Sequence, residues 1–136
     1  MKSILIDAGP LIALFDRSDS YHLKALHFVE QFQGTFWSTW PVITEVSHML
    51  DFSTKSQINF LKWLERGGVR IFEMQKLHLS RLIELTEKFD DVPMDLADAS
   101  LIVASEALNL NQIASIDSDF YIYRDIRNQY LNNVFS

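Results

Sequence analysis

Three acidic residues directly follow the ends of apolar runs. Asp7 comes after the run Ser3–Ile6, and Asp117 and Asp119 come after the run Ile113–Ile116. A carboxylate at the end of a buried strand is costly to desolvate, so it requires a partner. Asp7 therefore either caps the helix that follows it or holds a positively charged group.

Three further acids, Glu45, Asp95 and Asp98, fall in segments with helical patterns. Glu45 shares the i, i+3, i+4 spacing of Val42 and Val46, which places it on the apolar stripe of its helix. Asp95 and Asp98 are three residues apart and share one face at the start of another helix. Asp95 suits the N-cap of that helix, whereas Asp98 falls among small and apolar residues that are expected to be buried.

Carboxylates that converge without a lysine or arginine among them repel one another. Such a cluster is stable when a hard divalent cation neutralises it through oxygen ligands, and Mg²⁺ and Mn²⁺ are cations of this kind. The acids therefore indicate a site for a divalent cation, provided that the fold brings them together.

Strands and helices are expected to alternate along the whole chain, which predicts a three-layer α/β/α sandwich with a central, mainly parallel sheet. Strands are expected at 4–6, 35–38, 69–72, 113–116 and 132–135, and helices at 10–15, 21–32, 41–50, 54–64, 77–89 and 96–110. Segment 120–123 fits either a strand or a helical turn. Because sites in parallel sheets lie at the carboxyl ends of the strands, Asp7 and Asp117 are expected to meet if their strands are neighbours.

Composition favours one folded domain over residues 1–136, since 48% of the residues are hydrophobic and 12% are aromatic. We expect no membrane span and no signal peptide, because no apolar run approaches ~20 residues and no basic segment precedes the first apolar stretch. The absence of cysteine fits the cytoplasm. The net charge of −6 disfavours simple binding to a phosphate backbone, but it does not exclude a nuclease with a carboxylate-bound metal.

The order of the acids resembles that of the PIN-domain family, which includes the VapC-type toxins of bacterial and archaeal toxin–antitoxin pairs. The stretch "LIDAGPLIALFD" is similar to the first family motif, and "WPVITEV" is similar to the second. The stretch "LADASLIVASEALNLNQIASID", followed by "SDF", resembles the third and fourth motifs. The resemblance covers essentially the whole chain and implies Mg²⁺- or Mn²⁺-dependent cleavage of RNA phosphodiester bonds.

The resemblance also implies roles for individual residues. Its catalytic, metal-binding quartet falls on Asp7, Glu45, Asp98 and Asp117, and Asp95 and Asp119 are additional metal-ligand candidates. Ser115 stands where many members have threonine, which implies a hydroxyl that supports the metal ligands. Arg124 follows the fourth motif and is the best candidate for a cation that contacts the RNA.

The resemblance further implies a homodimer and a small antitoxin protein that inserts into the active-site groove. A non-catalytic RNA- or protein-binding module that keeps the fold is the alternative, and tight binding of a divalent metal would argue against it. A metal-dependent phosphatase with an aspartyl nucleophile is disfavoured, because Gly9 stands where a second Asp is expected. A receiver domain is disfavoured because it needs clustered acids early in the chain and a phospho-accepting Asp at mid-chain.

Overall fold

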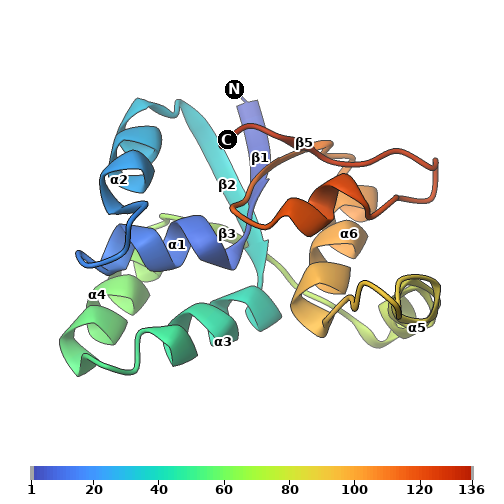
Figure 1. Cartoon of the computed structure of the whole chain (residues 1–136), viewed down its shortest axis with the longest axis horizontal. Coiled ribbons are helices and arrows are strands. Elements are labelled where there is room, and N and C mark those ends of the chain that lie inside the picture. Colours follow the sequence, from blue (N-terminus) through green and yellow to red (C-terminus); the bar gives the residue numbers. More distant parts are fainter. Residues whose placement is uncertain (1, 136) are drawn as a thin grey trace.

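The computed structural model describes residues 2–135 and confirms the three-layer α/β/α architecture (Figure 1). One five-stranded sheet has the order β3-β2-β1-β4-β5, and each pair of neighbouring strands is parallel. The strands are β1 (Lys2–Ile6), β2 (Gly34–Thr39), β3 (Arg70–Phe72), β4 (Gln112–Ala114) and β5 (Asn132–Asn133). This order places β1 at the centre of the sheet, with β2 and β4 on either side.

The helices cover both faces of the sheet. They are α1 (Ala8–Phe15), α2 (His22–Gln31), α3 (Trp40–Met49), α4 (Thr54–Glu65), α5 (Leu79–Lys88) and α6 (Leu96–Leu108), with short 3₁₀ helices η1 (Lys76–His78) and η2 (Ser118–Tyr121). Figure 1 shows α1, α2 and α4 on one side of the strands, with α5 and α6 on the other. Within residues 2–135, no helix has the length and apolar character needed to span a bilayer.

The central strand β1 is apolar on both faces because helices cover both. Ile4, Leu5 and Ile6 are fully buried, as expected for a strand inside a parallel sheet. In the register, Leu5 lies opposite Ile113 of β4. The backbone N–H of Asp7 donates to the carbonyl of Ala114 over 3.0 Å, so the pairing of β1 and β4 extends to Asp7.

Helix α6 lies against the sheet and is buried continuously from Ala97 to Ser105. Small side chains in this stretch allow a close approach to the sheet, and Asp98 is buried among them as the sequence predicts. Asp95 is the N-cap, and its side chain accepts the N–H of Asp98 over 2.8 Å. The helix ends at Asn109, whose φ of 55° is the left-handed conformation common after a helix.

The structure differs from the predicted elements mainly after residue 113. Strand β4 ends at Ala114, so Asp117 lies three residues beyond the strand instead of directly after it. The ambiguous segment at 120–123 begins in the 3₁₀ helix η2, because the side chain of Asp117 accepts the N–H of Asp119 and starts a helical turn. The last strand spans only Asn132–Asn133.

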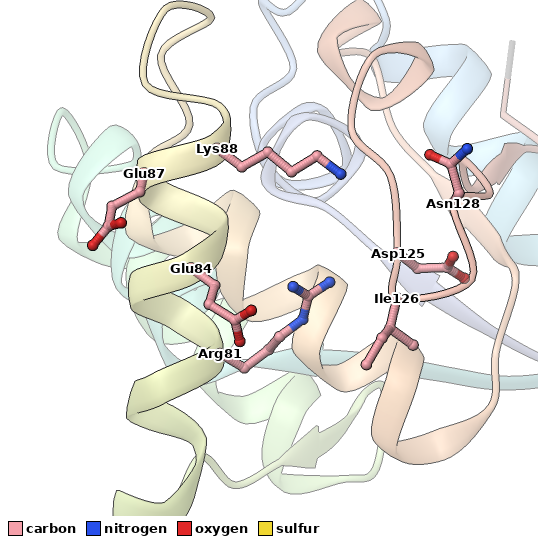
Figure 2. Close-up of a pocket in the computed structure, with 7 residues that line it drawn as sticks. All are labelled: Arg81, Glu84, Glu87, Lys88, Asp125, Ile126 and Asn128. Carbon is pink, nitrogen blue, oxygen red and sulfur yellow. The ribbon is translucent and has the colours of Figure 1, made fainter.

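An ion pair joins α5 to α6. The guanidinium of Arg81 donates to both carboxylate oxygens of Glu106, at 2.9 Å from Nε and 2.7 Å from Nη2. Glu106 also accepts the backbone N–H of Ile126 over 2.8 Å, which attaches the loop after η2 to α6. Figure 2 shows the charged hollow of about 630 Å³ that this arrangement leaves between α5 and the loop, with Lys88 extending across it.

Candidate metal centre

Asp7 is held at the carboxyl end of β1 and is only 6% exposed. It occupies the N-cap position of α1 but makes no side-chain capping hydrogen bond there. The hydroxyl of Ser115 instead donates to Oδ2 of Asp7 over 2.9 Å. A simple capping role therefore does not account for this buried carboxylate.

Asp117 lies in the loop that leaves β4, next to the end of β1. Its backbone N–H donates to Oγ of Ser115 over 2.9 Å, and its Oδ1 accepts the N–H of Asp119 over 2.9 Å. Ser115 thus contacts Asp7 through its hydroxyl hydrogen and Asp117 through its oxygen. Ser115, which is expected to support the metal ligands, is buried and lies between Asp7 and Asp117.

Asp98 reaches the same place from the first turn of α6 and is 8% exposed. Its Oδ2 accepts the hydroxyl of Tyr123 over 2.9 Å and the backbone N–H of Asp95 over 3.4 Å. Tyr123 is fully buried, and its ring forms edge contacts with Phe89 and Phe120. Sequence reasoning missed Tyr123, since only its tertiary contact with Asp98 distinguishes it from a core aromatic.

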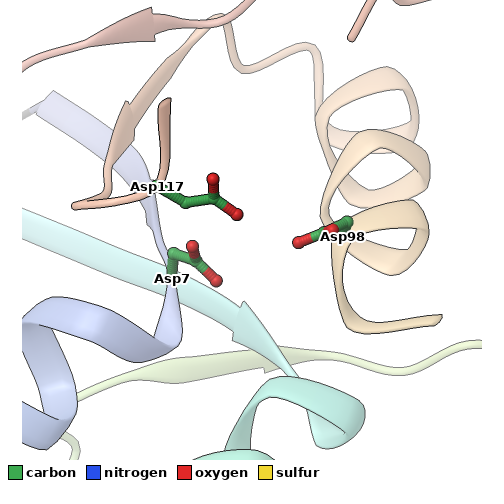
Figure 3. A group of neighbouring side chains, drawn as sticks. All are labelled: Asp7, Asp98 and Asp117. Carbon is green, nitrogen blue, oxygen red and sulfur yellow. The ribbon is translucent and has the colours of Figure 1, made fainter. Parts of the chain in front are cut away.

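The three aspartates converge. Figure 3 shows the carboxylates of Asp7 and Asp117 pointing toward that of Asp98 from the opposite side. One carboxylate oxygen from each lies within 4.8 Å of the others. The ion pairs among residues 2–135 involve other acids, Glu106 and Asp125, so no basic side chain of that range neutralises the three.

The environment disfavours the charged forms of two of these acids. Burial raises the pKa of Asp7 to about 6, although the nearby Ala8 N–H and the hydrogen bond from the Ser115 hydroxyl act in the opposite direction. Burial, together with the charge of Asp95, raises the pKa of Asp98 to about 7, against the opposing effect of the Tyr123 hydroxyl. Carboxylate oxygens that lack a basic partner suit a hard divalent cation, which would supply the missing positive charge.

Glu45 lies at the rim of the site and is exposed, so the prediction that it lies on the buried stripe of its helix is wrong. The buried side of α3 is formed by Val42, Ile43 and Val46, and Glu45 flanks it. Glu45 nevertheless lines the same small hollow of about 270 Å³ as the three aspartates, as does Asp95. Partial burial and repulsion from Asp95 and Asp117 raise the pKa of Glu45.

Two other candidates lie outside this hollow. Asp119 is not among its lining residues, although partial burial and the nearby charge of Asp117 raise its pKa. Arg124 turns back on its own segment: its Nη1 donates to the carbonyls of Tyr121, Ile122 and Tyr123 at 2.8, 2.9 and 3.1 Å. The prediction that Arg124 contacts RNA stays a prediction, and in this structure its guanidinium is engaged by its own backbone.

Comparison with known proteins gives a family match and a set of structural matches. The family model described as the PIN domain matches residues 4–126. No curated protein matches the chain in sequence.

Three solved structures share the fold. One is Mycobacterium tuberculosis VapC20, titled a Sarcin-Ricin loop cleaving toxin, with a TM-score of 0.79, 15% identity, and coverage of 88% of this chain and 93% of that one. A toxin–antitoxin complex from Klebsiella pneumoniae matches with a TM-score of 0.65, 17% identity, and coverage of 86% and 89%. Rickettsia felis VapBC2, bound to a promoter DNA fragment, matches with a TM-score of 0.65, 14% identity, and coverage of 97% and 98%. At these identities the likeness establishes the fold.

Proposed function

The chain belongs to the PIN domain family, and from that premise we propose that it is a metal-dependent endoribonuclease, the toxin of a toxin–antitoxin pair. The observation that carries the proposal is the convergence of Asp7, Asp98 and Asp117 without a basic partner. Carboxylates at the carboxyl ends of parallel strands lie where substrates bind in folds of this kind. The structural match to a toxin titled as cleaving the sarcin-ricin loop supports RNA cleavage as the activity.

Asp7, Asp98 and Asp117 would hold Mg²⁺ or Mn²⁺, with Glu45, Asp95 and Asp119 as further candidate ligands near them. When bound, the cation supplies a Lewis acid that polarises a phosphoryl oxygen and acidifies a water. Glu45 lines the same hollow from its exposed rim, and its raised pKa suits it to the role of a proton acceptor there. Asp95 fixes the first turn of α6 and thereby the position of Asp98.

The partners follow from the same proposal. RNA is the substrate, and a small antitoxin protein and a second copy of the chain are its protein partners. One structural neighbour is a toxin–antitoxin complex by title and another is the VapBC2 assembly, which supports the antitoxin. Residues 1–136 act as a single nuclease domain in the cytoplasm. Arg124 stays a candidate for RNA binding only if its guanidinium leaves the three carbonyls that it now contacts.

Cleavage of labelled RNA by the purified protein tests the proposal. Wild-type protein is expected to cut in Mg²⁺ or Mn²⁺ and to stop in EDTA. Asp7→Asn and Asp98→Asn, which keep the side-chain shape but remove a charge, are expected to abolish cutting. Asp91→Asn is the matched control, because Asp91 is exposed in the turn before α6.

Equal cleavage by wild type and both site variants, or cleavage that persists in EDTA, would contradict the proposal. The non-catalytic module would instead be supported if the wild-type protein bound RNA, did not cleave it and had no affinity for the metal.

A further inference from the structure

We propose that Tyr123 is a positioning residue that holds one carboxylate oxygen of Asp98 and leaves the other for the metal. The inference rests on the proposed function and goes beyond the ligand set. The hydroxyl of Tyr123 donates to Oδ2 of Asp98 over 2.9 Å. The remaining oxygen, Oδ1, is then the one available to a cation.

The surroundings of Tyr123 fix this hydroxyl in place. Its side chain is fully buried, and the rings of Phe89 and Phe120 each meet it edge-on with centroids 5.3 Å away. Its backbone N–H donates to the carbonyl of Asp119 over 3.1 Å, which ties it to η2. Because Tyr123 is buried, it cannot contact RNA directly, and it acts on the site only through Asp98.

The same pattern occurs at the other two aspartates. Oδ2 of Asp7 accepts the hydroxyl of Ser115, and Oδ1 of Asp117 accepts the N–H of Asp119. Each of the three aspartates therefore has one carboxylate oxygen that accepts a hydrogen bond from the protein. This disfavours bidentate binding of a cation by any of these carboxylates. Mg²⁺ binds through few carboxylate oxygens and keeps several waters, whereas Ca²⁺ takes 6–8 oxygens and often uses carboxylates in bidentate fashion. These three donors together favour Mg²⁺ or Mn²⁺ over Ca²⁺, and Tyr123 is the one that acts at Asp98.

The test replaces Tyr123 by Phe, which removes the hydroxyl and keeps the ring. Calorimetric titration with Mg²⁺, Mn²⁺ and Ca²⁺ is expected to show Mg²⁺ affinity weakened about tenfold or more. The ratio of Ca²⁺ to Mg²⁺ affinity is expected to rise, because the freed Asp98 carboxylate can bind a larger ion through both oxygens. Tyr121→Phe is the matched control, since it removes the hydroxyl of an exposed tyrosine in η2.

A purely structural role would lower the melting temperature in EDTA and leave both the Mg²⁺ affinity and the Ca²⁺ to Mg²⁺ ratio of the folded protein unchanged. That result would overturn the role of Tyr123 while leaving the nuclease proposal intact. Absence of any divalent-metal binding by the wild type, together with absence of RNA cleavage, would overturn both.

If Tyr123→Phe does not fold, infrared difference spectra of the wild type decide. Addition of Mg²⁺ to protein with ¹³C-labelled aspartate carboxylates is expected to widen the separation between the symmetric and antisymmetric stretches, as for ligands bound through one oxygen. A narrowed separation, which is typical of bidentate ligands, would overturn the proposal.

Discussion

The hydroxyl of Ser115 donates to Oδ2 of Asp7 over 2.9 Å, across the boundary between β4 and β1. The same hydroxyl oxygen accepts the N–H of Asp117 over 2.9 Å. One buried side chain therefore sets the spacing between acids that are far apart in the sequence. Neither acid has a basic partner in residues 2–135, and this serine binds the carboxylate of Asp7 directly and holds the backbone of Asp117.

Replacing Ser115 by Ala is expected to weaken metal affinity about tenfold or more, because Asp7 loses its donor and the Asp117 N–H loses its acceptor. Ser115→Thr keeps the hydroxyl and is expected to keep most of the affinity. Calorimetric Mn²⁺ titration of both variants checks this. Equal affinity in Ser115→Ala and wild type would show that the hydroxyl does not support the site.

The pKa values predict how the metal-free protein responds to pH. The pKa of Asp7 is raised to about 6 and that of Asp98 to about 7, so the folded state binds more protons than the unfolded state above pH 3.8. The contribution of these groups to stability is therefore fully present below about pH 4 and is lost as the pH rises through about 6 to 7. In EDTA at about pH 8, Asp98→Asn is expected to melt several degrees above wild type.

This difference between Asp98→Asn and wild type is expected to shrink as the pH is lowered toward 4. Added Mn²⁺ is expected to raise the wild-type melting temperature at about pH 8 and to leave the variant almost unchanged. Differential scanning calorimetry at several pH values makes both measurements. A wild type more stable than Asp98→Asn at high pH without metal would contradict the assigned cost of burying a charged carboxylate at Asp98.

Glu45 is expected to matter more for turnover than for metal binding. It is exposed at the rim of the hollow, outside the group of three oxygens that lie within 4.8 Å of one another. Glu45→Gln is therefore expected to bind Mn²⁺ with a smaller loss of affinity than Asp98→Asn, while RNA cleavage at saturating metal falls at least tenfold. A larger loss of affinity in Glu45→Gln than in Asp98→Asn would place Glu45 among the principal ligands.

The ion pair of Arg81 and Glu106 is expected to stabilise the fold without affecting chemistry. Glu106 accepts the hydrogen bonds of the Arg81 guanidinium and the N–H of Ile126. Glu106→Ala leaves Arg81 unpaired and is expected to lower the free energy of unfolding by about 1–3 kcal/mol. Glu87→Ala, at an exposed position of α5, is the control and is expected to stay within about 0.5 kcal/mol of wild type.

Urea unfolding measures the effect of Glu106→Ala, and its Mn²⁺ affinity is expected to match that of wild type below the transition. A variant as stable as wild type, or one that has lost metal binding while folded, would contradict this separation of roles.

Features that depend on neighbouring residues in the sequence were predictable from it. The apolar run of β1, the alternation of strands and helices, and the Asp95 cap of α6 follow from periodicity and capping chemistry, and the structure confirms them. The expected meeting of Asp7 and Asp117 depended on β1 and β4 being parallel neighbours, which they are.

Features that depend on tertiary contacts were not predictable. The buried side of α3 is a strip narrow enough to leave Glu45 exposed, which apolar spacing alone does not determine. Tyr123 is one of several aromatic residues near the end of the chain, and only the folded structure shows its hydroxyl on Asp98. Arg124 follows the fourth motif in sequence, but its guanidinium donates hydrogen bonds to three backbone carbonyls of its own segment.

Asp7, Asp98 and Asp117 are expected to hold one divalent cation together. Anomalous diffraction from crystals of the wild-type protein soaked in Mn²⁺ would locate that cation. A manganese peak is expected between the three carboxylates, bound to one oxygen of each, with no peak there in Asp98→Asn. An empty site in the wild type, or a peak only among the acids of the hollow between α5 and the 125–128 loop, would contradict it.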